Sequence, residues 1–251
     1  VLVSGEAGVG KTRLAEGCAN HLSWPGVRGL WGRCYEFERA LPYQPIAEAL
    51  RGALPTLAPG RPPDLPGWAL AEVARLVPDL LEHPIMRTPH NDPGREEDVG
   101  TRPEASRAER SDQEQARLFE GVTRLLAELS AQRRCLLVLE DLHWASKSTL
   151  QLLHYLVTHL VDHPIMILGT FRSEAVGPHH PLLPLRRRLV RDGEARSLRL
   201  SRLSREAVET LIVDMAGAGE AVVPLAERLY QETEGNPFFL MEIVKALFET
   251  G

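Results

Sequence analysis

The sequence is poor in the residues that stabilise disulfide-rich, metal-binding or membrane proteins. It contains only three cysteines, Cys18, Cys34 and Cys135, an odd number without the spacing of a metal site. We expect them to be reduced thiols in a cytoplasmic protein. No apolar run approaches the roughly 18 residues that cross a bilayer, and the opening Val1-Leu2-Val3 is not a charged leader. These shortages argue against a disulfide scaffold and against a membrane protein.

Lysine is also scarce, since only three of the 29 basic residues are lysines. The net charge of -5 is mild and gives no sign of a nucleic-acid surface spread over the whole domain. One basic cluster, Arg186-Arg187-Arg188 with Arg191, falls on a predicted helix without interleaved aromatic residues. We interpret it as a solvated helix face, and we expect no direct binding to nucleic acid.

Apolar runs alternate with helical patterns over the first 200 residues. Buried strands are predicted at 1–4, 27–34, 135–139, 165–170 and, more weakly, 196–200. Helices are predicted at 11–21, 42–54, 112–131 and 148–160. Strands that alternate with helices indicate an α/β fold with a parallel sheet and right-handed crossovers.

Two stretches depart from this alternation. Residues 55–110 form a proline-rich excursion, with some helical periodicity at 66–81 and a predicted surface loop at 83–110. From residue 204 onward the pattern is helical only, at 204–216, 220–233 and 237–249. We therefore expect a core over 1–200 and an all-α lid over 201–251. We also expect the chain to be part of a longer protein, with the lid truncated at its C-terminus.

The first predicted strand leads into Gly5-Glu6-Ala7-Gly8-Val9-Gly10-Lys11-Thr12-Arg13, a phosphate-binding loop (P-loop) that opens a helix. Glycines let backbone N–H groups converge on phosphate oxygens, and the helix N-terminus favours the same anion. Lys11 adds a positive charge for the β- and γ-phosphates, and the Thr12 hydroxyl can bind magnesium. The stretch from Gly5 to Arg13 therefore predicts a binding site for ATP with Mg²⁺.

Two acids, Glu140 and Asp141, end the predicted strand at 135–139. A P-loop enzyme needs a carboxylate at the tip of a neighbouring strand to hold the magnesium shell. Glu140 stands at the magnesium side, and Asp141 stands where an acid would polarise the attacking water. Because Asp is the commoner residue at the position of Glu140, we expect nucleotide binding with slow hydrolysis.

Four further segments support a family resemblance. They are Glu140 to Ser146 (EDLHWAS), Gly32 to Glu36 together with Leu41 to Pro45, Gly169 to Arg172 (GTFR), and Glu234 to Leu240 (EGNPFFL). Together they resemble the signalling ATPases of the STAND class, which are related to AAA+ proteins and occur in LuxR-type bacterial regulators and cyclase fusions. The resemblance covers nearly the whole chain apart from the proline-rich stretch.

This resemblance implies a three-layer αβα P-loop fold followed by an all-α lid. It implies that Arg172 senses the γ-phosphate and stabilises charge with Lys11, and that Pro237 lies near the nucleotide base. His143 and Trp144 are interpreted as packing residues. The implied function is an ATP-driven regulatory switch with fused effector and sensor domains, and with self-association on ATP binding.

Three alternatives stay open at this stage. The chain could be a nucleotide-binding scaffold without turnover, which Glu140 keeps possible. It could be an AAA+ ATPase associated with DNA, although the charge balance and the Leu142-His143-Trp144-Ala145 segment argue against that. A small-molecule kinase would need a basic lid, which the sequence does not indicate.

Overall fold

The computed structural model describes residues 1–21, 27–38, 41–56, 63–82, 107–216 and 222–250. Within these ranges five parallel strands form one sheet in the order β2-β3-β4-β1-β5. The strands are β1 (Leu2–Gly5), β2 (Arg28–Arg33), β3 (Cys135–Glu140), β4 (Ile165–Arg172) and β5 (Ser197–Arg199). The predicted α/β fold with a parallel sheet is confirmed.

The strand order changes one expectation about the acids. We expected Glu140 and Asp141 on a strand next to the P-loop strand, but β4 lies between β3 and β1. The register aligns Gly5 of β1 with Arg172 of β4, and Glu140 of β3 with Arg33 of β2. The chain crosses from β1 to β2 over the positions of β4 and β3. The strand that carries the acids, β3, therefore lies one strand farther from the P-loop than expected.

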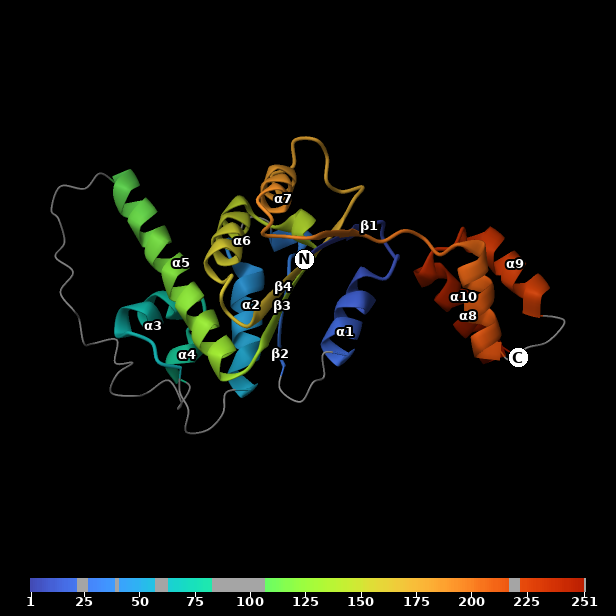
Figure 1. Ribbon diagram of the computed structural model, residues 1–251, viewed down its shortest axis with the longest axis horizontal. Helices are drawn as coiled ribbons and strands as arrows, with labels where there is room; N and C mark the ends of the chain where they lie inside the picture. The colour runs from blue at the N-terminus through green and yellow to red at the C-terminus, as the bar shows by residue number, and fades with distance from the viewer. Residues whose placement is uncertain (22–26, 39–40, 57–62, 83–106, 217–221, 251) are drawn as a thin grey trace.

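Helices cover both faces of the sheet, which gives the three predicted layers (Figure 1). One face is covered by α1 (Lys11–His21), which contacts β1, β3 and β4. The other face carries α2 (Gln44–Ala53), α5 (Arg107–Gln132) and α6 (Lys147–His159), and α7 (Leu182–Arg191) packs against α6. In the described ranges no helix combines the length and apolar character needed to cross a bilayer.

Part of the proline-rich stretch belongs to the core. The predicted helical region at 66–81 forms α3 (Gly67–Ala74) and α4 (Asp79–Glu82), which are separated at Pro78, a residue without an N–H group. Buried side chains of this region join the main hydrophobic core: Leu65, Leu70, Val73, Val77 and Leu80. Helix α5 begins at Arg107, earlier than predicted. Residues 83–106 lie outside the described residues.

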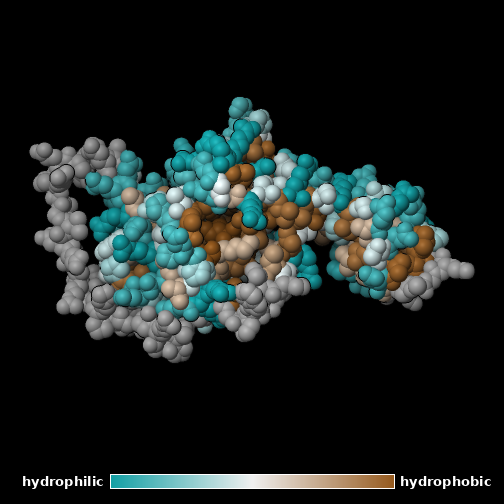
Figure 2. Space-filling view, in the orientation of Figure 1, coloured by the Kyte–Doolittle hydropathy of each residue, from teal (hydrophilic) through white to brown (hydrophobic). Residues whose placement is uncertain are grey.

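The helical lid consists of α8 (Arg205–Ala216), α9 (Val222–Thr233) and α10 (Pro237–Thr250). It encloses a hydrophobic cluster of its own: Val208, Ile212, Ala226, Leu229, Leu240 and Val244. Figure 1 shows the lid at the end of the segment that follows β5, and Figure 2 shows hydrophobic side chains both in a central hollow of the main body and on the lid. This cluster shares no residue with the main hydrophobic core.

We predict that Gly32→Ala in β2 destabilises the protein by about 3 kcal/mol, because its new methyl group would overlap backbone. A Cβ at this position would lie 1.7 Å from the Pro45 carbonyl oxygen of α2. Urea unfolding measures the loss. Gly52→Ala in α2 is the control, since a Cβ there has no atom within 4 Å. It should be neutral or stabilising by up to about 1 kcal/mol. Equal stability of the two variants would contradict the proposed packing.

Candidate functional site

The P-loop joins β1 to α1 and contains two glycines in the left-handed backbone region. Gly8 has a φ of 81° and Gly10 a φ of 94°, which other residues rarely adopt. Gly8 is also crowded, since a Cβ there would lie 2.6 Å from the Asn236 Oδ1 atom of the lid. The N–H groups in the first turn of α1 lack intrahelical acceptors, as at any helix N-terminus, and therefore favour an anion.

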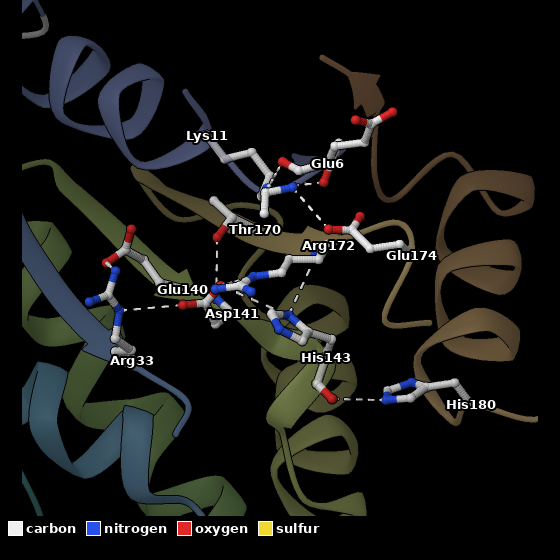
Figure 3. A network of polar contacts seen from close by, with 12 residues as sticks. Glu6, Lys11, Arg33, Glu140, Asp141, His143, Thr170, Arg172, Glu174 and His180 are labelled. Atoms are coloured by element: carbon white, nitrogen blue, oxygen red, sulfur yellow. Dashed lines mark hydrogen bonds and ion pairs between the residues drawn. The ribbon is translucent and has the colours of Figure 1, made fainter. Parts of the chain in front are cut away.

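Lys11 lies buried beneath this loop. Its Nζ atom donates hydrogen bonds to the carbonyl oxygens of Gly5 at 2.9 Å and Glu6 at 2.7 Å. Burial lowers the pKa of Lys11 from its ordinary value, whereas the carboxylates of Glu174 and Asp141 oppose that change. The ammonium group is therefore held by the loop itself, and its charge is stabilised by Glu174 and Asp141. Figure 3 shows Lys11 with these contacts at the P-loop.

The acids at the end of β3 both contact Arg33, the last residue of β2. Arg33 lies 3.2 Å from Glu140 Oε2 through Nη2 and 3.5 Å from Asp141 Oδ2 through Nε. Glu140 is buried, and its Oε1 atom has no hydrogen-bond partner. Sequence reasoning missed Arg33 as a site residue because only the sheet order brings β2 beside β3.

Residues of β4 fill the space between the acids and the P-loop. Asp141 has a left-handed backbone with a φ of 56°, and its N–H donates to the Thr170 hydroxyl at 3.2 Å. The Arg172 side chain lies 4.0 Å from Asp141 Oδ1 through its Nε atom. A non-glycine residue with a left-handed backbone, such as Asp141, is uncommon and is often found at functional sites. Asp141 is therefore held between two guanidinium groups, those of Arg33 and Arg172.

His143 contacts the backbone of Arg172. Its Nδ1 atom accepts a hydrogen bond from the Arg172 N–H at 3.4 Å, and its carbonyl oxygen lies 3.0 Å from His180 Nε2. The side chain is buried, and its ring lies 4.7 Å from that of Trp144. This placement agrees with the predicted packing interpretation and adds a contact to the strand that carries Arg172.

The lid contacts the P-loop through the start of α10. Asn236 is buried; its Nδ2 atom donates to the Ala7 carbonyl oxygen at 3.1 Å, and its Oδ1 atom accepts from the Phe238 N–H at 3.1 Å. The Phe238 N–H also lies 3.2 Å from the Gly8 carbonyl oxygen. Pro237, which we expected near a nucleotide base, is the first residue of α10 and lies between these two contacts.

An ion network makes a second connection. Arg202, in the segment between β5 and α8, lies 2.9 Å from Glu6 Oε2 and also pairs with Glu234 before α10. The turn at Gly235 is tight, because a Cβ there would lie 2.1 Å from the Leu203 carbonyl oxygen. Two separate sets of contacts thus join the lid to the P-loop.

The structure brings most of the predicted site residues to one edge of the sheet. Gly5 to Thr12, Glu140, Asp141 and Arg172 meet there, whereas Arg13 extends into solvent and pairs with Glu16 at 3.5 Å. The additional residues at this edge are Arg33, Thr170, Glu174, Arg202 and Asn236. Arg33, Thr170 and Asn236 fall in segments that carry the family resemblance. Asn236 also had a signal of its own, as an N-cap residue type before a proline at a helix start.

The donor set fits a phosphate chain with a divalent cation. The Ala7 N–H of the P-loop already donates to a carboxylate, Glu174 Oε1, at 2.9 Å, so the loop binds an anionic oxygen. The unpartnered Glu140 Oε1 is a buried acceptor of the kind that magnesium or its bound water satisfies. Thr12, half-buried in the first turn of α1, supplies the hydroxyl.

We predict that His143 makes the free energy of unfolding depend on pH. Burial, the largest cause, lowers the pKa of His143 from 6.5 to about 4. The unfolded chain therefore binds a proton that the folded chain excludes, and stability is lost as the pH falls from 6.5 towards 4. Between pH 7.5 and pH 5 the loss should be about 2 kcal/mol. Urea unfolding of the parent chain and of His143→Gln at both pH values measures it, and an equal decline in both would contradict this assignment.

Comparison with solved structures gives distant similarities. A Thermotoga maritima RuvB variant is 15% identical with a TM-score of 0.43, and the match covers 97% of this chain and 52% of that one. The Aeropyrum pernix ORC1 protein in complex with DNA is 17% identical with a TM-score of 0.46, covering 100% and 53%. The T. maritima RuvB Holliday junction branch migration motor is 13% identical with a TM-score of 0.34, covering 98% and 61%. The chain thus spans about half of the first two proteins.

A comparison with curated proteins gives no significant match. The family model for the AAA ATPase domain, however, matches residues 1–168, from β1 into β4. This range includes the P-loop, Arg33 and both acids, and it ends before Arg172 and the lid. Since the match covers more than half of the sequence, the chain belongs to the AAA ATPase domain family.

Proposed function

We propose that this chain binds ATP with Mg²⁺, hydrolyses it slowly, and acts as the regulatory switch of a larger bacterial signalling protein or transcriptional regulator. One observation carries the proposal: the P-loop, two acids and Arg172 meet at one edge of the sheet, and the lid is bonded to the same loop. The core over 1–200 would bind the nucleotide, and the lid over 201–251 would respond to it.

In this proposal the P-loop holds the phosphates through its backbone N–H groups. Lys11 would exchange its bonds to the Gly5 and Glu6 carbonyl oxygens for the β- and γ-phosphate oxygens. Thr12 and Glu140 would hold Mg²⁺, which when bound neutralises charge on the phosphate oxygens. Pro237 would lie towards the base, as the family resemblance implies.

Hydrolysis would follow in-line attack by water on the γ-phosphorus. The Asp141 carboxylate would accept a proton from the water while the water oxygen bonds to the γ-phosphorus. The bond between the γ-phosphorus and the bridging oxygen would break and release ADP. Lys11 and Arg172 stabilise the negative charge that develops on the transferred group and the leaving oxygen. Phosphate leaves, and Asp141 returns its proton to solvent.

Slow turnover is proposed because Asp141 is already engaged in contacts before reaction. Guanidinium groups of Arg33 and Arg172 lie within 4.0 Å of its two carboxylate oxygens. Each contact holds an oxygen that would otherwise be free to meet the attacking water, so one of the contacts must loosen before Asp141 can act as the base. Glu140 is likewise paired with Arg33, so the two acids are coupled through one side chain.

The switch would operate through the bonds between the lid and the P-loop. ATP and ADP differ only at the terminal phosphate, and a conformational change requires different affinities for the two arrangements. Because Asn236 bonds the Ala7 carbonyl oxygen, a shift of the loop on phosphate binding moves the start of α10. Fused effector and sensor domains would read this movement, with self-association on ATP binding as one output.

We predict that Lys11→Ala weakens ATP binding by about tenfold to a hundredfold, because a charge-assisted contact is lost. Asp141→Asn should bind ATP normally and slow single-turnover phosphate release by about 100-fold or more. Asparagine tolerates the left-handed backbone at this position, so the loop should be preserved. Titration calorimetry and a phosphate-release assay measure the two effects.

The outcomes separate the proposed ATPase from its alternative. Unchanged ATP binding by Lys11→Ala would refute the nucleotide site. Normal turnover by Asp141→Asn would refute its role as base. If the parent chain binds ATP but releases no phosphate over hours, the nucleotide-binding scaffold replaces the ATPase.

We predict that Asn236→Ser and Asn236→Ala both reduce the response of α10 to ATP. Serine can still cap α10, but its shorter side chain does not reach the Ala7 carbonyl oxygen, whereas alanine loses both functions. The amide exchange of α10 should then respond to ATP less than in the parent chain. Only the alanine variant should lose about 1 kcal/mol of lid stability. Hydrogen exchange measured by mass spectrometry tests this, and an unchanged response in both variants would exclude Asn236 as the coupling residue.

A further inference from the structure

Glu174 is a carboxylate bonded to the P-loop itself. It follows β4 by two residues, and its Oε1 atom accepts a hydrogen bond from the Ala7 N–H at 2.9 Å. Figure 3 shows the side chain directed towards the P-loop beside Lys11, with Arg172 at the end of β4. A protein anion thus occupies one donor of a loop whose geometry favours anionic oxygens.

The same carboxylate acts on Lys11 through its charge. Among the charges that stabilise the Lys11 ammonium, Glu174 has the largest effect, ahead of Asp141, and both oppose the lowering of the Lys11 pKa by burial. Lys11 and the Ala7 N–H are therefore both influenced by Glu174. A phosphate that approaches these groups meets a negative charge already in place.

We propose that Glu174 competes with the terminal phosphate for the P-loop and thereby lowers the preference of the site for ATP over ADP. This inference rests on the proposed function, because it assumes that the P-loop binds the nucleotide. Lys11 reaches the β- and γ-phosphates in P-loop proteins, so a carboxylate beside Lys11 repels the terminal phosphate most. ADP has one phosphate fewer and experiences less repulsion.

The competition has a direct consequence for a switch. ATP binding requires Glu174 to leave the Ala7 N–H or to tolerate a second anion beside it. Either event costs free energy that ADP avoids. Because Arg172, the last residue of β4, lies two residues before Glu174, withdrawal of Glu174 also alters the end of β4. At rest Glu174 therefore shifts the site towards its ADP-bound or empty form.

Two substitutions separate the charge of Glu174 from its hydrogen bond. Glu174→Gln removes the charge but keeps a side-chain oxygen that can accept from the Ala7 N–H, whereas Glu174→Ala removes both. Glu16→Gln is the matched control, because Glu16 is an exposed carboxylate one turn into α1 that pairs with Arg13. It removes the same charge near the loop without touching a loop N–H group.

The experiment is titration calorimetry of the intact chain with ATP, ADP and inorganic triphosphate in Mg²⁺ buffer. For both Glu174 variants we expect ATP and triphosphate to bind about threefold to tenfold tighter than to the parent chain. ADP should gain less, and Glu16→Gln should resemble the parent chain. The gain should shrink as salt is raised from about 0.05 to 0.5 M, since the repulsion is screened.

Other results identify which proposal fails. If the parent chain binds ATP and neither Glu174 variant binds it more tightly, Glu174 is not a competitor, and the nucleotide site itself stands. Weaker binding by both variants would make Glu174 a support for the loop and would overturn the inference. If neither the parent chain nor any variant binds ATP or triphosphate, the proposed function fails and the inference fails with it. Binding of ATP by both Glu174 variants but not by the parent chain would support the inference and the proposed function together.

A measurement without nucleotide adds a structural check. The Ala7 amide proton should show the downfield NMR shift of a charge-assisted hydrogen bond in the parent chain. It should move upfield in Glu174→Gln and further in Glu174→Ala. An amide signal that is the same in all three chains would show that the contact is absent in solution and would overturn the inference.

Discussion

The site depends on one geometric constraint, the common edge at which five parallel strands end. Each strand leaves its last residue there, so residues far apart in the sequence meet. They are the P-loop after β1, Arg33 on β2, Glu140 at the end of β3 with Asp141 after it, and Arg172 on β4. Ligands of open α/β sheets bind outside the carboxyl ends of the strands for this reason. Because β4 lies between β1 and β3, its Arg172 is positioned between the loop and the acids.

Charge pairing is the second organising feature of this edge. Lys11 is held by loop carbonyl oxygens, Arg33 by the two acids, and Arg202 by Glu6 and Glu234. The cations and anions of the edge thus have partners within the protein. Under the proposed function, an incoming phosphate exchanges protein contacts for its own, which suits a slowly turning regulatory switch better than a rapid hydrolase.

Family membership and the proposed switch rest on different parts of the chain. The AAA ATPase domain match ends at residue 168. The proposed role of the lid rests on its contacts, which are the Asn236 bond to the P-loop and the Arg202 network. The lid has its own hydrophobic cluster and is joined to the P-loop by polar contacts. This arrangement is expected of a unit that moves as a body, as the proposed switch requires.

Elements with local signals could be predicted from the residues alone. The P-loop from Gly5 to Thr12, the apolar strand before Glu140 and the change to helices after residue 204 depend on neighbouring residues, and the α/β fold followed from their alternation. The strand order and the partners of Arg33, Glu174 and Asn236 became known only from the folded structure, because these contacts join residues distant in the sequence. Such contacts form only when crossovers and packing bring the strand ends together. No local pattern of residues specifies which strand ends become neighbours.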